Sequence, residues 1–384
     1  MKAPAAVAPL AIVTTSAALG AERVDCRYYR ADEANPATMA EDPGPLEGLL
    51  LPDNDVFRPI LADQREPRFY ADYRRVHFRF SNSELLAEGK GPNIDAGMVG
   101  LGGEFGIWGL RQPRGCDGLQ VSLFGVVFAQ FNLDTPSVDL LNADYLVGPM
   151  LTYRRGPWSA RLRFYHQSSH LGDEFLLNYG IANGVHRQNL SVEVVDLVVS
   201  LEDEWWRVFA GGGLVVLSDK DLNLTSTPGV VQYGLELRGP AWGWRNSSLR
   251  PVFGSALSQF QGTGWSLNGS LEGGLEWASP STARRIRALV VAQRGALPFS
   301  QFFSEKTENI GVQLQFEFWP RIVRCMRRQV TARSSVQLAT EDKALGRPEF
   351  CGQLVREILG THRRRETVLE SSTAAAHLAP KRHQ

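Results

Sequence analysis

The sequence lacks several features that would define its class at once. It has only four cysteines, Cys26, Cys116, Cys325 and Cys351, and they are scattered without the spacing of metal ligands. They neither staple a small disulfide fold nor predict a zinc site. Net charge is also missing, because 41 basic side chains balance 41 acidic ones. This balance argues against a nucleic-acid-binding protein and against an acidic tail protein.

Long hydrophobic runs are absent as well. No stretch approaches the roughly 18 consecutive apolar residues of a transmembrane helix. A membrane-spanning form of this chain must therefore be a β-barrel, the other architecture that satisfies its backbone hydrogen bonds in lipid. Glycine, by contrast, is abundant at 37 residues, and aromatic residues reach 10%. Length alone permits one large β domain or two ordinary ones.

The clearest strand pattern lies between Asn309 and Phe318. Apolar side chains occupy every second position, and polar or small ones occupy the positions between, which is the period of a strand with one apolar and one wet face. The apolar face consists of Ile310, Val312, Leu314, Phe316 and Phe318. This stretch resembles the closing strand of bacterial outer-membrane β-barrels. An edge strand of a soluble sandwich looks similar, so the assignment depends on how often the pattern recurs.

The pattern recurs along most of the chain. Twelve stretches are predicted as strands: 69–80, 94–109, 119–131, 143–154, 158–170, 188–202, 205–218, 229–239, 247–261, 264–278, 284–295 and 309–318. Single-chain bacterial barrels use even numbers of antiparallel strands of about this length. The face between the apolar positions is too charged for a sandwich core and fits a wet or salt-bridged lumen. The sequence therefore predicts an all-β fold, an antiparallel transmembrane β-barrel of about 12 strands.

Connections and tryptophans support this prediction independently. If the last strand runs toward the periplasm, short periplasmic turns should alternate with longer outer loops. They do so except at 261–264, a short connection on the outer side. Tryptophan prefers a membrane interface because its ring is amphipathic. All tryptophans but Trp265 lie at predicted periplasmic strand ends: Trp108, Trp158, Trp205, Trp206, Trp242, Trp244, Trp277 and Trp319.

Four regions are predicted along the chain. Residues 1–20 are a predicted signal peptide, because Lys2 precedes a mostly apolar run that ends in small residues. Residues 21–67 are a polar, proline-punctuated periplasmic lead-in segment that can pack at the barrel mouth. Residues 68–318 form the barrel. Residues 319–384 carry 13 basic and 6 acidic side chains and are predicted to be a disordered basic tail, the alternative being a tail attracted to anionic surfaces.

Two segments carry a family resemblance. The run from Phe57 to Pro67, with its Phe-Arg-Pro, Leu-Ala-Asp and Arg-Glu-Pro groups, and the run from Tyr165 to Glu174 resemble the bacterial DUF1207 family. The likeness spans roughly residues 45 to 318. It implies an exported protein and supplies no activity.

One constellation on the fifth predicted strand can carry chemistry. Even positions from Trp158 to Phe164 are apolar, so His166 and Ser168 continue the face that points toward lipid. Two residues apart on a strand, the imidazole stands beside the hydroxyl and can take its proton. This pair resembles the His-x-Ser of outer-membrane phospholipase A and lipid A deacylase, barrels with an active site on the outer wall. That resemblance implies a serine-dependent lipid ester hydrolase.

Such a pair needs a third group to hold the histidine tautomer. Glu193 shares the lipid-facing side of the next strand, and its height above the short turn matches that of His166. It is the candidate orienter, with Asn189 behind it. The sequence departs from the two hydrolase families in having Ser169 and His170, where they have Asn-Gly, and in a longer following loop. The alternative is a set of polar residues at the outer rim.

A metal and a channel are also considered. His170, Asp173 and Glu174 are candidate ligands for a divalent cation, which a cation-dependent hydrolase needs, although solvated loop charges look the same. No other cofactor is predicted. Inward-facing charges suit either a channel that selects small solutes or a lumen filled by paired side chains. The predicted inward set is Arg161, Arg163, Asp196, Glu202, Glu236, Arg238, Glu272 and Glu276.

These observations predict the cellular location of the protein better than its activity. We expect an integral outer-membrane protein of a Gram-negative-type bacterium. Its expected partners are outer-membrane lipids and the barrel assembly machinery, and not nucleic acid. Three activities stay open: a structural barrel, a porin-like small-solute channel, and a lipid ester hydrolase.

Overall fold

The structure is a computed structural model that describes ten segments of the chain. They are 45–52, 56–78, 93–112, 116–177, 190–219, 223–244, 247–279, 284–296, 300–303 and 306–317. All belong to one compact unit, residues 1–318. The predicted signal peptide and the basic tail lie outside the described residues, so both stay predictions.

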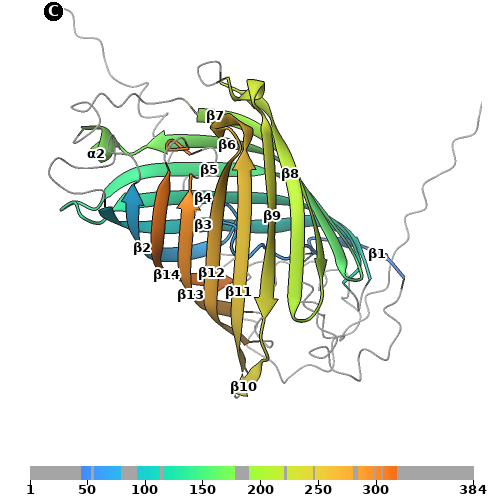
Figure 1. Ribbon diagram of the computed structural model, residues 1–384. Helices are drawn as coiled ribbons and strands as arrows, with labels where there is room; N and C mark the ends of the chain where they lie inside the picture. Colours follow the sequence, from blue (N-terminus) through green and yellow to red (C-terminus); the bar gives the residue numbers. More distant parts are fainter. Residues whose placement is uncertain are drawn as a thin grey trace, which may run out of the picture. The chain divides into compact units, whose positions relative to one another are not determined.

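The described chain is almost entirely antiparallel β-sheet, and its sheet closes on itself (Figure 1). Twelve described strands make the ring: β2 (Phe69–Phe78), β3 (Asn93–Arg111), β4 (Gly118–Asn132), β5 (Asp139–Arg155), β6 (Trp158–Leu171), β7 (Leu190–Glu202), β8 (Trp206–Ser218), β9 (Gly229–Arg238), β11 (Ser247–Phe260), β12 (Ser266–Ser279), β13 (Arg284–Gly295) and β14 (Thr307–Glu317). Each pairs with its neighbours along the chain, and β14 pairs with β2. The predicted 12-strand barrel is confirmed.

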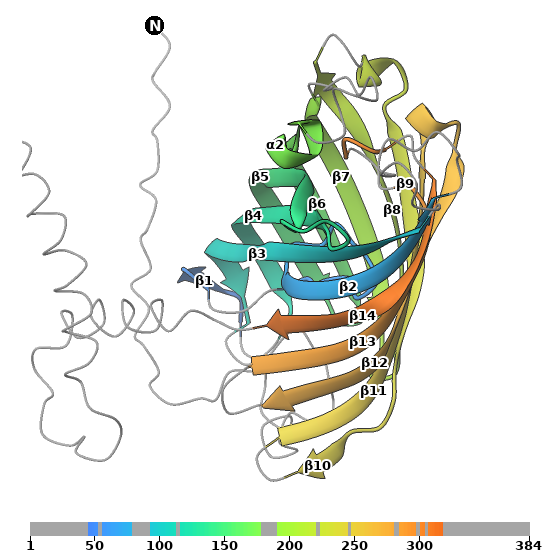
Figure 2. The same ribbon diagram turned by 90° about the vertical axis from the view of Figure 1, so that its left-hand side faces the viewer.

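Two short strands lie outside this ring. Strand β1 (Glu47–Leu50) pairs with the end of β3, and β10 (Trp242–Trp244) pairs with the start of β11. Figure 2 shows the ring strands curving around a common interior. The described helical elements are single turns: α2 (Asp173–Phe175), η3 (Leu224–Ser226) and η4 (Gln261–Thr263). None of the described helices is long and apolar enough to cross a membrane.

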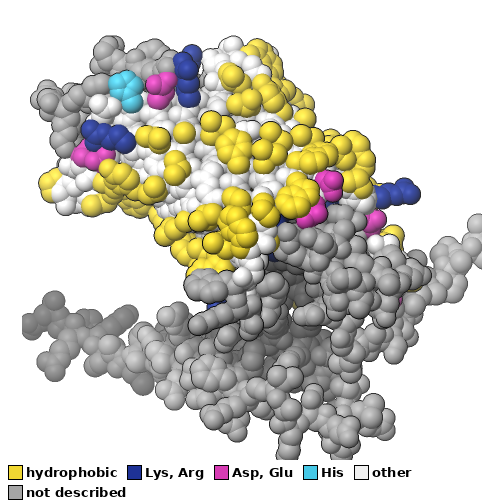
Figure 3. Space-filling model, turned by 60° about the horizontal axis from the view of Figure 1, so that its bottom comes forward, with side chains coloured by type: hydrophobic (Ala, Val, Ile, Leu, Met, Phe, Trp, Pro, Cys, Tyr) yellow, Lys and Arg dark blue, Asp and Glu magenta, His cyan; other side chains and the backbone are white. Residues whose placement is uncertain are grey.

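Alternation along the strands separates two surfaces. On β14, Ile310 and Val312 are 60% and 58% exposed, whereas Gln313 and Gln315 are buried. The outward side chains are largely apolar, and Figure 3 shows them gathered over the outer wall, with charged groups toward its edges. An exposed apolar surface of this extent is unfavourable in water and marks a site of interaction. A surface of this kind fits a lipid environment.

The two ends of the barrel differ. We call them the short-turn end, which includes the 156–157 turn between β5 and β6, and the long-loop end, which includes the connection between β6 and β7. Exposed tryptophans lie at the short-turn end of five strands, β3, β6, β8, β10 and β12: Trp108, Trp158, Trp206, Trp242 and Trp277. Trp265 lies at the other end, before β12. Aromatic rings at a barrel rim are typical of the membrane interface.

The lumen contains a segment of the chain itself. Residues 56–68, which we call the plug, lie between β1 and β2 in sequence and are largely buried. Val56, Ile60 and Ala62 have no exposed surface, and Phe57 is nearly as buried. Phe57 and Ile60 pack against inward-facing side chains of β7 and β8, and Leu61 packs against β11 and β13. The described end of the predicted lead-in thus lies inside the barrel.

Ion pairs and hydrogen bonds fix the plug to the wall. Arg58 contacts Glu236 at 2.7 Å and Glu202 at 3.1 Å, and Glu236 also accepts the backbone N–H of Leu61 at 2.7 Å. Arg154 pairs with Glu202 and donates to the carbonyl of Val56 at 3.0 Å. Two of the predicted inward-facing acids, Glu202 and Glu236, therefore hold a peptide segment inside the barrel.

Phe57 is held by stacking as well as by burial. The guanidinium carbons of Arg161 and Arg207 lie 4.8 and 4.6 Å from its ring centroid. A desolvated cation over an aromatic ring is worth about 2 kcal/mol. In both arginines Nε and Nη2 have no hydrogen-bond partner among the described residues, whereas Nη1 donates to Glu66 from Arg161 and to the Arg58 carbonyl from Arg207.

Candidate functional site

The candidate site lies on the outer wall of β6 and β7. Along β6, Arg161 and Arg163 point inward and are buried, whereas Leu162 and Phe164 point outward and are 41% and 47% exposed. The backbone alternation continues, so His166 and Ser168 also point outward. The wall at this position therefore changes from apolar to polar toward the long-loop end.

His166 and Glu193 are direct cross-strand partners. The distance between His166 Nδ1 and Glu193 Oε1 is 3.0 Å, and the two side chains are 43% and 28% exposed. A carboxylate at this distance accepts a hydrogen bond from Nδ1–H, so the neutral ring carries its hydrogen on Nδ1. Nε2 then keeps its lone pair and can act as a base.

Ser168 lies one alternation step beyond His166 on the same face. Its cross-strand partners are Tyr145 on β5 and Ser191 on β7. The Ser168 side chain is partly exposed, and none of the described residues hydrogen-bonds to its hydroxyl. The structure thus places the three predicted residues Ser168, His166 and Glu193 on one patch of the outer wall.

Apolar side chains surround this patch on the side of the barrel middle. Val147, the β5 neighbour of His166, is 56% exposed, and Leu197 on β7 is 47% exposed. Leu217, the β8 neighbour of Glu193, is 61% exposed.

The predicted metal ligands lie beyond the patch. His170 is exposed, and its ring meets that of Tyr145 edge to face, with centroids 5.8 Å apart. Asp173 and Glu174 belong to α2. No group of three His, Cys, Asp or Glu side chains in the described part of the chain is arranged to hold a metal ion. Asn189, the second candidate orienter, lies outside the described residues.

The inner face of β5 and β6 holds a polar cluster that the sequence did not predict. Ser169 bonds to Asp144 and, at 2.9 Å, to Asn142, while Asn142 bonds to Asp144 at 2.8 Å. Arg65 of the plug contacts the other Asp144 oxygen at 2.7 Å. These bonds join the plug to the wall, while Arg65 Nη2 has no hydrogen-bond partner among the described residues.

The fold and the site define a class: a closed β-barrel of the outer-membrane type with a filled lumen and a Ser-His-Glu constellation on its outer wall. Residues 16–318 match the family described as "Protein of unknown function (DUF1207)". The chain belongs to this family. A search of curated proteins gives no match.

Solved structures with a similar fold are outer-membrane barrels. Outer membrane phospholipase A from Escherichia coli is 14% identical, with 67% of this chain and 93% of that chain covered and a TM-score of 0.42. The β domain of the Bordetella autotransporter BrkA is 13% identical, with coverages of 66% and 99% and a TM-score of 0.35. A mutant porin of Rh. blastica is 7% identical, with coverages of 65% and 99% and a TM-score of 0.27. None of these likenesses assigns a role to a residue of this chain.

Proposed function

We propose that this protein is an outer-membrane lipid ester hydrolase whose active site lies on the outer wall of a barrel with a filled lumen. The observation that carries the proposal is the 3.0 Å contact between His166 Nδ1 and Glu193 Oε1, beside a serine hydroxyl on the same face. A carboxylate on Nδ1 and a serine near the ring is the arrangement that activates a serine nucleophile.

Each residue has a defined task in this reaction. Ser168 Oγ attacks the ester carbonyl carbon while His166 Nε2 takes the hydroxyl proton, and Glu193 stabilises the imidazolium that forms. When the tetrahedral intermediate collapses, the bond to the alcohol oxygen breaks and His166 returns the proton to that oxygen. Water then attacks the acyl-serine with His166 again as base, which releases the fatty acid and restores Ser168.

The position of the site on the wall favours a lipid substrate. His166 lies eight positions above Trp158, which marks the short-turn interface. A rise of about 3.3 Å per residue and a strand tilt of roughly 40° place it about 20 Å above that interface, near the opposite edge of an apolar band about 25 Å tall. Ester groups of outer-leaflet lipids lie at this height, with their acyl chains directed toward the barrel middle.

The filled lumen argues against the small-solute channel. The plug residues Val56, Phe57 and Ile60 are buried against the wall, and Arg58 joins two wall carboxylates. An ion crossing the lumen would have to displace these groups. We expect purified protein in planar bilayers to give no current above leak. A steady conductance in the wild type would favour the channel, and loss of envelope integrity on deletion without hydrolysis would favour a structural barrel.

The decisive experiment compares two serine variants on paired strands. Ser168→Ala should abolish release of fatty acid from phospholipid or acylated lipid in mixed micelles. Ser191→Ala, which removes the cross-strand neighbouring hydroxyl, should keep most of the activity. Both should keep the heat-resistant gel mobility of a folded barrel. Undiminished hydrolysis in folded Ser168→Ala would remove the proposal.

A further inference from the structure

The lumen contains a cavity on the side of the plug that faces the long-loop end. Its volume is about 90 Å³. Plug residues 62–65 form one wall, and strands β6 to β9 and β11 to β13 form the others. Lining residues near the long-loop ends of their strands include Val230, Asn268 and Ala296. The cavity belongs to the lumen and is separate from the outer-wall site.

The two arginines that line the cavity are each paired with a carboxylate. Arg163 donates to Asp196 through two nitrogens, at 3.0 and 2.6 Å, and Arg65 pairs with Asp144 at 2.7 Å. The remaining faces of these guanidinium groups lie on aromatic rings, with Arg163 5.4 Å from the Tyr165 centroid. One guanidinium nitrogen of each arginine, Arg65 Nη2 and Arg163 Nη1, has no hydrogen-bond partner in the described part of the chain and can donate to a neutral ligand oxygen. Because a carboxylate already balances the charge of each arginine, the cavity favours a neutral ligand over a carboxylate or phosphate.

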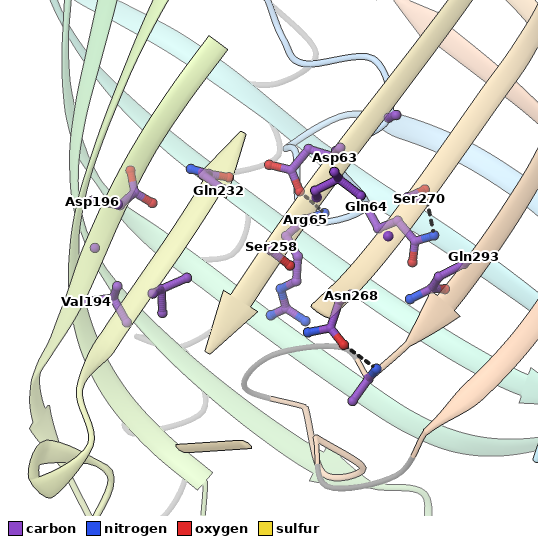
Figure 4. Close-up of a pocket in the computed structure, with 18 of the residues that line it drawn as sticks. Asp63, Gln64, Arg65, Val194, Asp196, Gln232, Ser258, Asn268, Ser270 and Gln293 are labelled. Carbon is purple, nitrogen blue, oxygen red and sulfur yellow. Dashed lines mark hydrogen bonds between the residues drawn. The ribbon is translucent and has the colours of Figure 1, made fainter. Parts of the chain in front are cut away.

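Free hydrogen-bonding groups do face the cavity. Asp63 accepts the backbone N–H of Arg65 at 2.9 Å through one oxygen, and its second oxygen has no partner in the described part of the chain. The Gln232 amide and the Ser258 hydroxyl also bond to no described residue. Figure 4 shows Asp63, Gln232 and Ser258 coming from the plug and two different strands around the same space.

These groups are better suited to bind the hydroxyl groups of a ligand than to bind a cation. An amide and a hydroxyl both donate and accept, as the hydroxyl groups of a ligand do. An ammonium ion at Asp63 would lie near the positive charges of Arg163 and Arg65. Val230 and Ala256 add an apolar surface for C–H groups. A site of a few polar groups set among apolar ones is the usual composition of a small-molecule pocket.

The size of the space sets the size of the ligand. A water molecule needs about 10–15 Å³ of this kind of volume, so the cavity holds roughly six waters. Glycerol has as many heavy atoms. We propose that the cavity binds a small neutral polyol of about glycerol size through Asp63, Gln232 and Ser258. The bound polyol replaces water in the long-loop half of the lumen, while the plug blocks passage through the other half.

Asp63 has an environment that suits this role. It belongs to the plug and not to a membrane-spanning strand. Burial raises its pKa, and the charge of Glu66 raises it further, while Arg163 and Arg161 act in the opposite direction. The ionised carboxylate accepts a hydrogen bond from a ligand hydroxyl, and the protonated form donates one. Asp63 can therefore hydrogen-bond to a ligand hydroxyl in either protonation state.

The test uses saturation-transfer NMR on the full chain folded in detergent micelles, with glycerol and erythritol as probes. Ser258→Leu fills the cavity and should abolish saturation transfer. Ser255→Leu is the matched control, because the same change on the same strand lies on the outer face, opposite Leu235 and Leu271. It should leave the signal unchanged. Gln232→Leu should weaken the signal at least severalfold.

Two results would overturn the proposal. One is an equal glycerol signal in the wild type and in folded Ser258→Leu. The other is displacement of glycerol by ethylammonium or acetate at similar concentration, which would mean that the cavity selects charge. If Ser258→Leu does not fold, Gln232→Leu and Asp63→Asn decide the question, and unchanged binding in both would contradict the proposal.

Discussion

Both the inner and the outer face of strand β6 carry polar side chains, but the inner ones bond to other strands and the outer ones have fewer bonds to the protein. On the inner face, Arg163 and Ser169 are buried and bonded to groups on other strands. On the outer face, His166 has one bond, to Glu193, and Ser168 has none to a described residue. Buried polar side chains that bond to neighbouring strands stabilise the fold. A polar side chain on the outer face with few bonds to the protein is available to react. Variants on the two faces should therefore fail in different ways.

The largest effect is expected from His166→Ala. Loss of the general base should lower hydrolysis by at least about 10³-fold. The free energy of unfolding should change by less than about 0.5 kcal/mol, because the side chain is at the surface. Fatty-acid release and urea unfolding of the same preparation check both statements. If His166→Ala lowers the free energy of unfolding enough to explain the lost hydrolysis, His166 has a structural role like the residues of the inner face.

The second prediction concerns the inner side and the plug. Arg58→Ala removes one partner from Glu202 and Glu236, and should lower the free energy of unfolding by about 3–5 kcal/mol, since buried charges lose their counterion. Tryptophan fluorescence in a guanidinium titration measures this change. Hydrolysis by the remaining folded protein should stay near the wild-type rate. A stable Arg58→Ala barrel would mean that the plug is held mainly by apolar packing.

Glu193→Gln tests the contact between the two strands more finely. The amide keeps the size of the side chain but loses the charge that stabilises the imidazolium, so hydrolysis should fall about 10²-fold. Glu193→Asp should recover part of the rate if the carboxylate reaches Nδ1. Equal rates in all three proteins would show that the pair is only a surface contact, of the kind worth less than about 1 kcal/mol.

The smallest effect is expected from Asp63→Asn, through the pH dependence of stability. The raised pKa of Asp63 means that the folded state holds this proton more tightly than the unfolded chain. Its stabilising contribution is present below the ordinary value of 3.8 and is lost as the pH rises through the raised folded value. Asp63→Asn should therefore gain stability relative to wild type as pH increases. A difference that does not vary with pH would contradict the assignment.

Much of the barrel wall could be predicted from the sequence because lipid and lumen impose opposite preferences on alternate residues. Every ring strand from β2 to β14 coincides with a predicted one within a few residues. His166 and Glu193 were matched in height by counting from short turns, which works because both strands rise at the same rate per residue. The position of most tryptophans at one end of the strands could be predicted by the same counting.

The lumen contents could not be predicted in this way. The plug touches wall residues on several sides, so its side chains follow no period, and only the three-dimensional structure shows that Phe57 lies between Arg161 and Arg207. The bond between Arg65 and Asp144 joins residues 79 positions apart. Strands β1 and β10 are too short to show alternation. The cavity is lined by plug residues 62–65 and by strands far apart in the sequence, so no local pattern predicts it.

Strand β1 has a mechanical consequence. It pairs with β3 at Trp108–Arg111, and β2 pairs with the same edge of β3 at Asn93–Gly100. The chain between them leaves one strand, enters the interior and returns to that strand. A segment anchored at both ends in this way can bow but cannot swing out on a single hinge. Moving the plug out of the lumen would first require breaking the pairing of β1 with β3. The four residues of β1 therefore hold the plug in place.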